Sequence, residues 1–163
     1  MPYTARDDPC NNLQNISLGR VAGVRGYETL LANDQNAVMK HLAEVGPLAV
    51  VVDASRFGIR YTGGVFDDCD YDQNIEINHA VQLVGYGYNA KDGAFWIVRN
   101  SWGAQWGEKG YIRMRRDTVA KCGKDKTPAT GIRCKKDGIR EDKVCGQCGI
   151  LFAPSYPIGV YSN

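Results

Sequence analysis

A series of apolar segments separated by short turns is the feature that most limits the folds open to this chain. Residues 48–52 are a β-branched run, and residues 80–87 and 94–100 are further apolar segments that read as strands. Residues 110–115 alternate apolar and polar side chains, as a half-exposed strand does. Strands that follow one another with short turns form antiparallel sheets, which can curl into a barrel. We therefore predict an antiparallel, barrel-like sheet.

One short helix is expected before the first of these long strands. Apolar residues recur at helical spacing over residues 35–45, and either Asn33 or Asp34 can cap the first turn. Gly46-Pro47 ends the helix. Together with the strands, this helix predicts the α+β class.

The remaining segments are polar and rich in turn residues. Residues 1–20 are read as an extended lead-in, 26–30 as a short strand and 58–72 as a loop. Residues 115–143 hold ten Lys or Arg against five Asp or Glu, a net charge of +5 within a chain whose total is +2. Because this stretch is also poor in large apolar residues, we interpret it as a solvated, disulfide-tied loop rather than a polyanion-binding patch.

Cysteine usage favours an oxidising compartment. An even count without regular metal spacing indicates disulfides, and the sequon at Asn15 agrees weakly. A zinc site is the weaker alternative, since one Cys-x-x-Cys pair with two wide gaps departs from the usual spacing. No apolar run approaches the ~20 residues that span a bilayer. The six cysteines are Cys10, Cys69, Cys122, Cys134, Cys145 and Cys148.

The two histidines have different surroundings in the sequence. His41 lies within the expected helix and is predicted to be a surface residue. His79 lies where a polar loop meets a buried strand, so a rigid scaffold could present its imidazole at a cleft. Asn100 ends the next strand, 21 residues later. Its amide can accept the imidazole N–H and fix the ring, and Trp102 can shield that hydrogen bond.

Several longer motifs carry a resemblance to a known family. The segments 78–87 (Asn-His-Ala-Val-Gln-Leu-Val-Gly-Tyr-Gly) and 96–103 (Trp-Ile-Val-Arg-Asn-Ser-Trp-Gly) resemble the histidine and asparagine segments of papain-like cysteine peptidases of the cathepsin L-like type. Residues 106–111 extend the second motif, and residues 148–157 resemble the family's C-terminal signature. The chain is similar to the C-terminal half of such a peptidase.

The resemblance implies a fold and a domain organisation. Residues 1–163 would form the family's right-hand domain, an α+β unit with a barrel-like antiparallel sheet and short helices. Residues 120–147 would be an inserted, basic, cysteine-containing loop. The helical left-hand domain, which bears the catalytic cysteine, would be lacking.

The resemblance also implies a thiolate mechanism. His79 would be the acid/base that pairs with a cysteine thiolate, and Asn100 would orient it. The nucleophile is expected roughly 130–150 residues before the histidine, so Cys145-Gly146-Gln147-Cys148 is rejected for that role. We predict a cysteine-type endopeptidase that needs an N-terminal cysteine-bearing domain or chain as partner. The chain alone is predicted to be inactive, and the alternative is a pseudoprotease or peptide-binding half-domain.

The same resemblance implies a pocket for the substrate side chain two residues before the scissile bond. Its apolar lining predicts Leu, Phe or Val there, because an unpaired basic group would be costly to desolvate. Trp102 would shape the leaving-group side. The other residues implied to contact the protein or peptide substrate are Val51, Ile77, Asn78, Ala80 and Ala153.

The remaining expectations concern cross-links, partners and location. The resemblance implies a Cys69–Cys148 disulfide and a partner for Cys10 in the cysteine-bearing half, while the pairing of the other cysteines stays open. It implies no cofactor, no metal, and neither nucleic-acid nor membrane partners. A lysosomal, vacuolar or extracellular location is expected.

Overall fold

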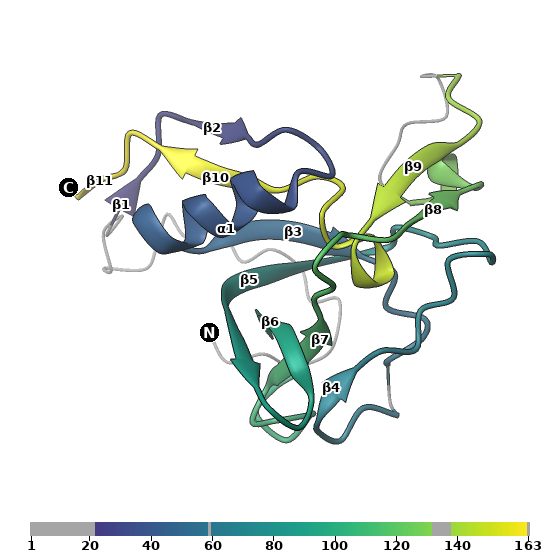
Figure 1. Ribbon diagram of the computed structural model, residues 1–163. Helices are drawn as coiled ribbons and strands as arrows, with labels where there is room; N and C mark the ends of the chain where they lie inside the picture. Colours follow the sequence, from purple (N-terminus) through teal and green to yellow (C-terminus); the bar gives the residue numbers. More distant parts are fainter. Residues whose placement is uncertain (1–21, 59, 132–137, 163) are drawn as a thin grey trace.

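The computed structural model describes residues 22–58, 60–131 and 138–162. A seven-stranded sheet in the order β2-β10-β3-β5-β6-β7-β4 is its main element, and two-stranded sheets join β1 to β11 and β8 to β9 (Figure 1). The strands are β1 (Ala22–Gly23), β2 (Gly26–Thr29), β3 (Leu48–Val52), β4 (Val65–Phe66), β5 (His79–Asn89), β6 (Gly93–Arg99), β7 (Tyr111–Arg115), β8 (Cys122–Asp125), β9 (Asp142–Cys145), β10 (Ser155–Ile158) and β11 (Tyr161–Ser162).

The expected α+β class is confirmed, while the sheet itself is open. Its pairings are antiparallel except that β4 pairs with β7 in parallel. The edge strands β2 and β4 do not pair with each other among the described residues, so these do not close a barrel. The polar loop expected over residues 58–72 contributes the two-residue strand β4.

The single α-helix of the described residues, α1 (Gln35–Glu44), begins and ends close to the expected positions. Asp34 is the cap, because its side chain accepts a hydrogen bond from the Ala37 backbone N–H. Two 3-10 turns, η2 (Pro128–Thr130) and η4 (Gln147–Gly149), lie further along the chain. No helix of the described part is long and apolar enough to cross a membrane.

His41 contradicts the expectation of a surface side chain. It lies on the buried side of α1 with only 7% of its surface exposed, and its ring packs 4.2 Å from that of Tyr156 in β10. The helical spacing did not reveal this contact because Tyr156 lies far along the chain.

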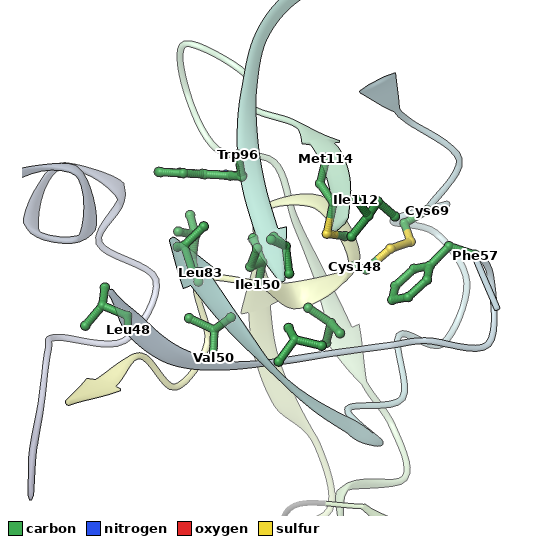
Figure 2. Packing of buried hydrophobic residues seen from close by; sticks show 14 of the residues in the cluster. Leu48, Val50, Phe57, Cys69, Leu83, Trp96, Ile112, Met114, Cys148 and Ile150 are labelled. Carbon is green, nitrogen blue, oxygen red and sulfur yellow. A yellow bond between two sulfur atoms is a disulfide. The ribbon is translucent and has the colours of Figure 1, made fainter. Parts of the chain in front are cut away.

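Two apolar clusters hold the elements together. The larger lies between α1, the sheet and η4 and is built around Trp96, Leu48 and Ile150, all fully buried (Figure 2). The Cys69–Cys148 disulfide lies within it. The smaller cluster comprises Ile75, Ile77, Val144 and Phe152. It joins the segment before His79 to strand β9.

Candidate active site

His79 is the first residue of β5, and the strands beside it fix its backbone. It lies opposite Val52 at the end of β3. The preceding residues are held as well, because the Asn78 N–H donates to the Val52 carbonyl over 3.2 Å and the Glu76 N–H to the buried Asp53 carboxylate over 3.2 Å. The half-buried imidazole therefore projects from a rigid strand end, as the sequence predicts.

Asn100 lies directly after β6, which pairs with β5 in antiparallel register. Its backbone N–H donates to the Gly110 carbonyl over 2.9 Å, so the chain beyond the strand is fixed. This arrangement brings the Asn100 Oδ1 atom to 2.9 Å from His79 Nε2. The two residues that the sequence singles out are thus in direct contact.

A backbone contact decides which way the Asn100 amide faces. The Ser101 N–H donates to Asn100 Oδ1 over 2.8 Å. Turning the amide over would bring its NH₂ group against this donor, so Oδ1 is the atom that meets the histidine. His79 Nε2 must then carry the proton of their hydrogen bond. Its other nitrogen, Nδ1, is left to exchange a proton with a reactant.

Trp102 covers the histidine. The two rings stack with their centroids 4.9 Å apart and their planes inclined by 26°. Trp106 supports Trp102 edge-on at 5.1 Å, and its own indole N–H donates to the Gly58 carbonyl over 2.7 Å. The aromatic cover limits the access of water to the imidazole–amide hydrogen bond.

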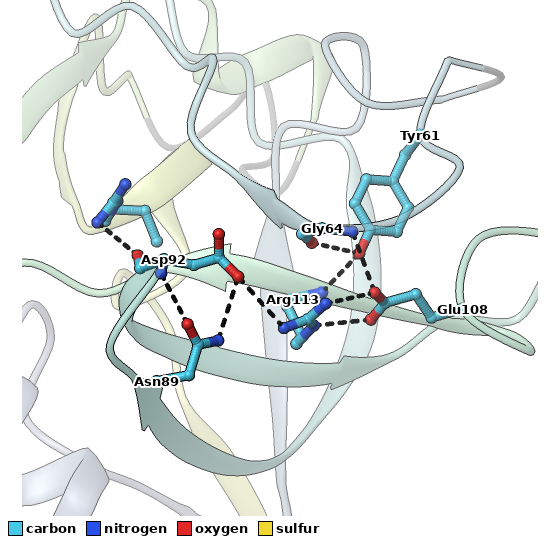
Figure 3. Close-up of polar contacts among 7 residues, drawn as sticks. Tyr61, Gly64, Asn89, Asp92, Glu108 and Arg113 are labelled. Carbon is cyan, nitrogen blue, oxygen red and sulfur yellow. Dashed lines mark hydrogen bonds and ion pairs between the residues drawn. The ribbon is translucent and has the colours of Figure 1, made fainter.

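An ion pair fixes the loop that carries both tryptophans (Figure 3). Arg113 in β7 donates to both carboxylate oxygens of Glu108, over 2.9 and 2.7 Å. The Gly64 N–H donates to the same carboxylate over 3.0 Å. The Arg113 guanidinium holds the pKa of the Glu108 carboxyl below its usual range. Glu108 therefore joins the 101–110 loop to β7 and to the segment before β4.

A pocket of about 300 Å³ opens beside His79. Val51, Ile77 and Ala80 line it, together with Asn78, whose side-chain oxygen accepts the Ala54 N–H over 3.0 Å. The structure does not place Ala153 on the pocket surface. Instead Ala153 packs, like Val51, against the small apolar cluster behind it.

The pocket has two further lining residues that the sequence does not predict. Thr130 and Gly131 belong to the segment interpreted as a solvated excursion. Parts of that segment form most of the β8–β9 hairpin, and Gly123 and Asp125 within it are buried. An apolar stripe would have revealed the hairpin from the sequence. The strands β8 and β9 have few apolar residues, and a buried carboxylate and a disulfide stabilise them instead.

Comparison with known proteins identifies the family. The family model described as "Papain family cysteine protease" matches residues 1–132. The chain belongs to the papain family. This confirms the resemblance stated on the histidine and asparagine segments.

Curated members of the papain family align with almost the whole chain. Vignain from Vigna mungo is 37% identical over 96% of this chain, and the thiol protease SEN102 from a Hemerocallis species is 36% identical over 99% of it. These alignments cover 36% and 37% of the two relatives. This papain-family chain thus spans little more than a third of their length.

Solved structures of papain-family proteases have the same fold. Bromelain from Ananas comosus, determined in complex with the E64 inhibitor, superposes with a TM-score of 0.60 at 33% identity, covering 83% of this chain and 50% of bromelain. Digestive procathepsin L 3 from Tenebrio molitor gives a TM-score of 0.59 at 32% identity, covering 83% of this chain and 35% of that one.

The four described cysteines of this papain-family chain are all in disulfides. Cys69 bonds to Cys148, the pair that the resemblance implied, and Cys122 bonds to Cys145. The weaker zinc alternative would use Cys122, Cys134, Cys145 and Cys148, and three of these four sulfurs are in the two bonds. No cluster of His, Cys, Asp or Glu suited to a metal occurs among the described residues. Cys10, Cys134 and Asn15 lie outside them.

Proposed function

We propose that this chain provides the histidine–asparagine side of a cysteine endopeptidase active site. The observation that carries the proposal is the 2.9 Å contact between His79 Nε2 and Asn100 Oδ1. Because the Ser101 N–H fixes the amide, the imidazole ring is oriented before any substrate arrives. Nδ1 is then the atom that faces the nucleophile.

The nucleophile is a cysteine thiolate supplied by an N-terminal cysteine-bearing domain or chain. Neither described disulfide can supply it without reduction. When the thiol is beside the imidazole, its proton passes to Nδ1 and the two groups form an ion pair.

The proposed reaction follows from these positions. The thiolate sulfur attacks the peptide carbonyl, and the imidazolium proton moves from Nδ1 to the leaving amine as the C–N bond breaks. A thioester remains on the cysteine. Water then attacks this thioester, with His79 taking its proton at Nδ1 and returning a proton to the sulfur, which leaves as the thiol. Asn100 keeps the ring in the same orientation throughout both halves.

The pocket beside His79 suits the substrate side chain two residues before the scissile bond. Its wall includes Val51, Ile77 and Ala80. We propose that proteins or peptides with an apolar residue at that position are the substrates, and that Trp102 borders the leaving-group side. The disulfides fit an oxidising location, for which a lysosome, a vacuole or the extracellular space is proposed.

Thiol reactivity tests this function directly. Residues 1–163 would be produced together with the cysteine-bearing domain of the complete protein, and the rate of alkylation by iodoacetamide would be followed against pH. A thiolate paired with His79 reacts rapidly well below the ordinary cysteine pKa of about 8.5. His79→Ala should abolish this fast reaction and lower peptidase turnover at least about 100-fold.

His41→Gln is the matched control, because it changes the other histidine, which packs against Tyr156 away from the site. It should leave the alkylation profile unchanged. Residues 1–163 alone should show no peptidase activity. Slow alkylation of the assembled wild type would contradict the proposed function and favour a peptide-binding domain without catalysis.

A further inference from the structure

The β8–β9 hairpin is attached to the segment that leads into His79. The Ile75 N–H donates to the Lys124 carbonyl over 3.0 Å, and Asn74 and Lys124 form a parallel bridge. Figure 1 shows the hairpin standing beside the end of β3, where β5 begins. The hairpin thus supports the segment that leads to Ile77 in the pocket lining, and β3 pairs with His79 and Ala80 in the same lining.

A buried carboxylate makes this attachment rigid. Asp125, with none of its surface exposed, accepts the Ile77 N–H at Oδ2 over 3.1 Å and the Thr127 N–H at Oδ1 over 2.9 Å. One side chain therefore connects the pocket wall at Ile77 to the turn that follows β8. Because a buried charge is stable only when its oxygens are hydrogen-bonded, these contacts fix the position of the turn.

The turn that follows, residues 128–131, reaches the pocket itself. Thr130 and Gly131 line it together with Val51 and Ala80. A Cβ atom on Gly131 would lie 2.0 Å from the Ile77 carbonyl oxygen, so only glycine allows this close contact. The Thr130 hydroxyl donates to a carboxylate oxygen of Glu76 over 2.8 Å, and this hydrogen bond attaches Thr130 to the segment before His79.

We propose that this turn is a substrate-specificity element that narrows the pocket. The inference rests on the proposed function and adds to it the residues that limit the size of the bound side chain. With Thr130 and Gly131 held against the wall, the pocket favours compact branched side chains such as Val or Leu over Phe. Removing atoms from the turn, or displacing it, widens the pocket toward aromatic side chains.

Peptide substrates that differ only in the residue two before the scissile bond test the proposal. The assembled protease, residues 1–163 with the cysteine-bearing domain, would be assayed with Val, Leu and Phe at that position. Thr130→Ala should raise the ratio of kcat/KM for Phe over that for Val about tenfold, the usual effect of a small change in pocket volume. Thr130→Val restores the side-chain volume, so it should bring the ratio back toward wild type.

Gly131→Ala moves the turn without removing any pocket atom and should change the ratio in the same direction as Thr130→Ala. Gly26→Ala is the matched control. Gly26 lies in β2, and an added methyl there makes only ordinary contacts of 3.7 and 3.8 Å with Ile158 in the adjacent strand β10. It should leave the ratio unchanged. Thermal melting shows whether each variant folds. If Gly131→Ala does not fold, Thr130→Ala alone tests the specificity role of the turn.

Iodoacetamide alkylation separates the two proposals, since it does not use the pocket. Fast alkylation with an unchanged Phe-to-Val ratio in a folded Thr130→Ala would overturn the specificity role and leave the proposed function standing. Slow alkylation of the wild type would overturn both.

Discussion

At Asn100 one side-chain oxygen accepts two hydrogen bonds with different roles. The bond from the Ser101 N–H fixes the amide, and the bond with His79 Nε2 transmits that orientation to the imidazole. An amide is suited to this position because it stays neutral at every pH, whereas a carboxylate would also change the charge of the pair.

Asn100→Ala tests this role as a positioning residue. The ring keeps its stacking on Trp102 but loses the acceptor that orients it, so turnover should fall about 10–100-fold with little change in KM. The measurement is kcat and KM of the assembled protease on one apolar substrate. Asn100→Gln, which retains an amide acceptor, should recover part of the loss. Equal losses in the two variants would contradict a role for the amide.

The sequence predicts the His79–Asn100 pair well because local strand register decides it. His79 begins β5 and Asn100 directly follows β6, its antiparallel neighbour, so the turn at residues 89–93 and the register shift between Leu83 and Gly85 set their alignment. The burial of His41 and the Cys122–Cys145 bond depend instead on contacts between distant segments. Periodicity over a short window contains no information about such contacts.

Among the elements, the β8–β9 hairpin is one whose polar sequence gives a wrong prediction of its structure. Its charged residues indicate a solvated loop, yet Gly123 packs so closely that a Cβ there would lie 2.9 Å from the Tyr71 carbonyl. Buried and exposed residues alternate along β8, and the last two residues of β9, Val144 and Cys145, are both buried. The long strands and the helix were predictable from apolar residues, whereas this hairpin depends on Asp125.

Asp125→Ala should therefore lower the free energy of unfolding by about 1–3 kcal/mol, because two backbone N–H groups lose their acceptor. Urea unfolding checks this. Glu141→Ala is the control in the same hairpin, since Glu141 makes an exposed ion pair with Lys124. Its removal should cost less than about 1 kcal/mol. Equal losses in the two variants would contradict a special role for the buried carboxylate.

The Glu108–Arg113 pair gives the asparagine loop a pH-dependent attachment. Glu108 has a lowered pKa in the folded protein, so its ionised form stabilises the fold at pH values above the ordinary pKa of glutamate. That stability is lost as the pH falls through the lowered folded-state pKa.

Glu108→Gln should cost about 1–2 kcal/mol of unfolding free energy at neutral pH, since a half-exposed ion pair with several hydrogen bonds is lost. The difference from wild type should shrink as the pH falls below the ordinary glutamate pKa of about 4.3, because the carboxyl of the unfolded chain then takes up a proton before that of the folded protein does. Unfolding midpoints measured from pH 7 to pH 3 check the trend. A difference that stays constant over this range would contradict it.

Across the whole molecule, the two disulfides close loops of unequal length. Cys69 and Cys148 are 79 residues apart, and Cys122 and Cys145 are 23 apart. The longer loop restricts the unfolded chain more. The first bond lies in the main core, whereas Cys122 is exposed.

Replacing Cys122 and Cys145 by Ala should therefore lower the unfolding free energy by about 3.5 kcal/mol, and replacing Cys69 and Cys148 by about 4.5 kcal/mol, on the loop-entropy scale. Denaturant unfolding of the two double variants gives the order. Under mild reduction, mass spectrometry of alkylated peptides should find Cys122 modified first. A larger loss from the Cys122–Cys145 replacement would contradict this ranking.

The position of β10 has a consequence for biosynthesis. This strand lies between β2 and β3, so residues 155–158 complete a sheet whose other strands are made much earlier. While the ribosome is still adding residues before 155, β2 has no neighbour on that side and the buried face of His41 has no Tyr156 to cover it. The domain must wait for its last strands before it becomes stable, and pairings over such sequence distances form slowly. Nascent chains stalled before residue 155 would therefore be the form most exposed to chaperones and to proteolysis.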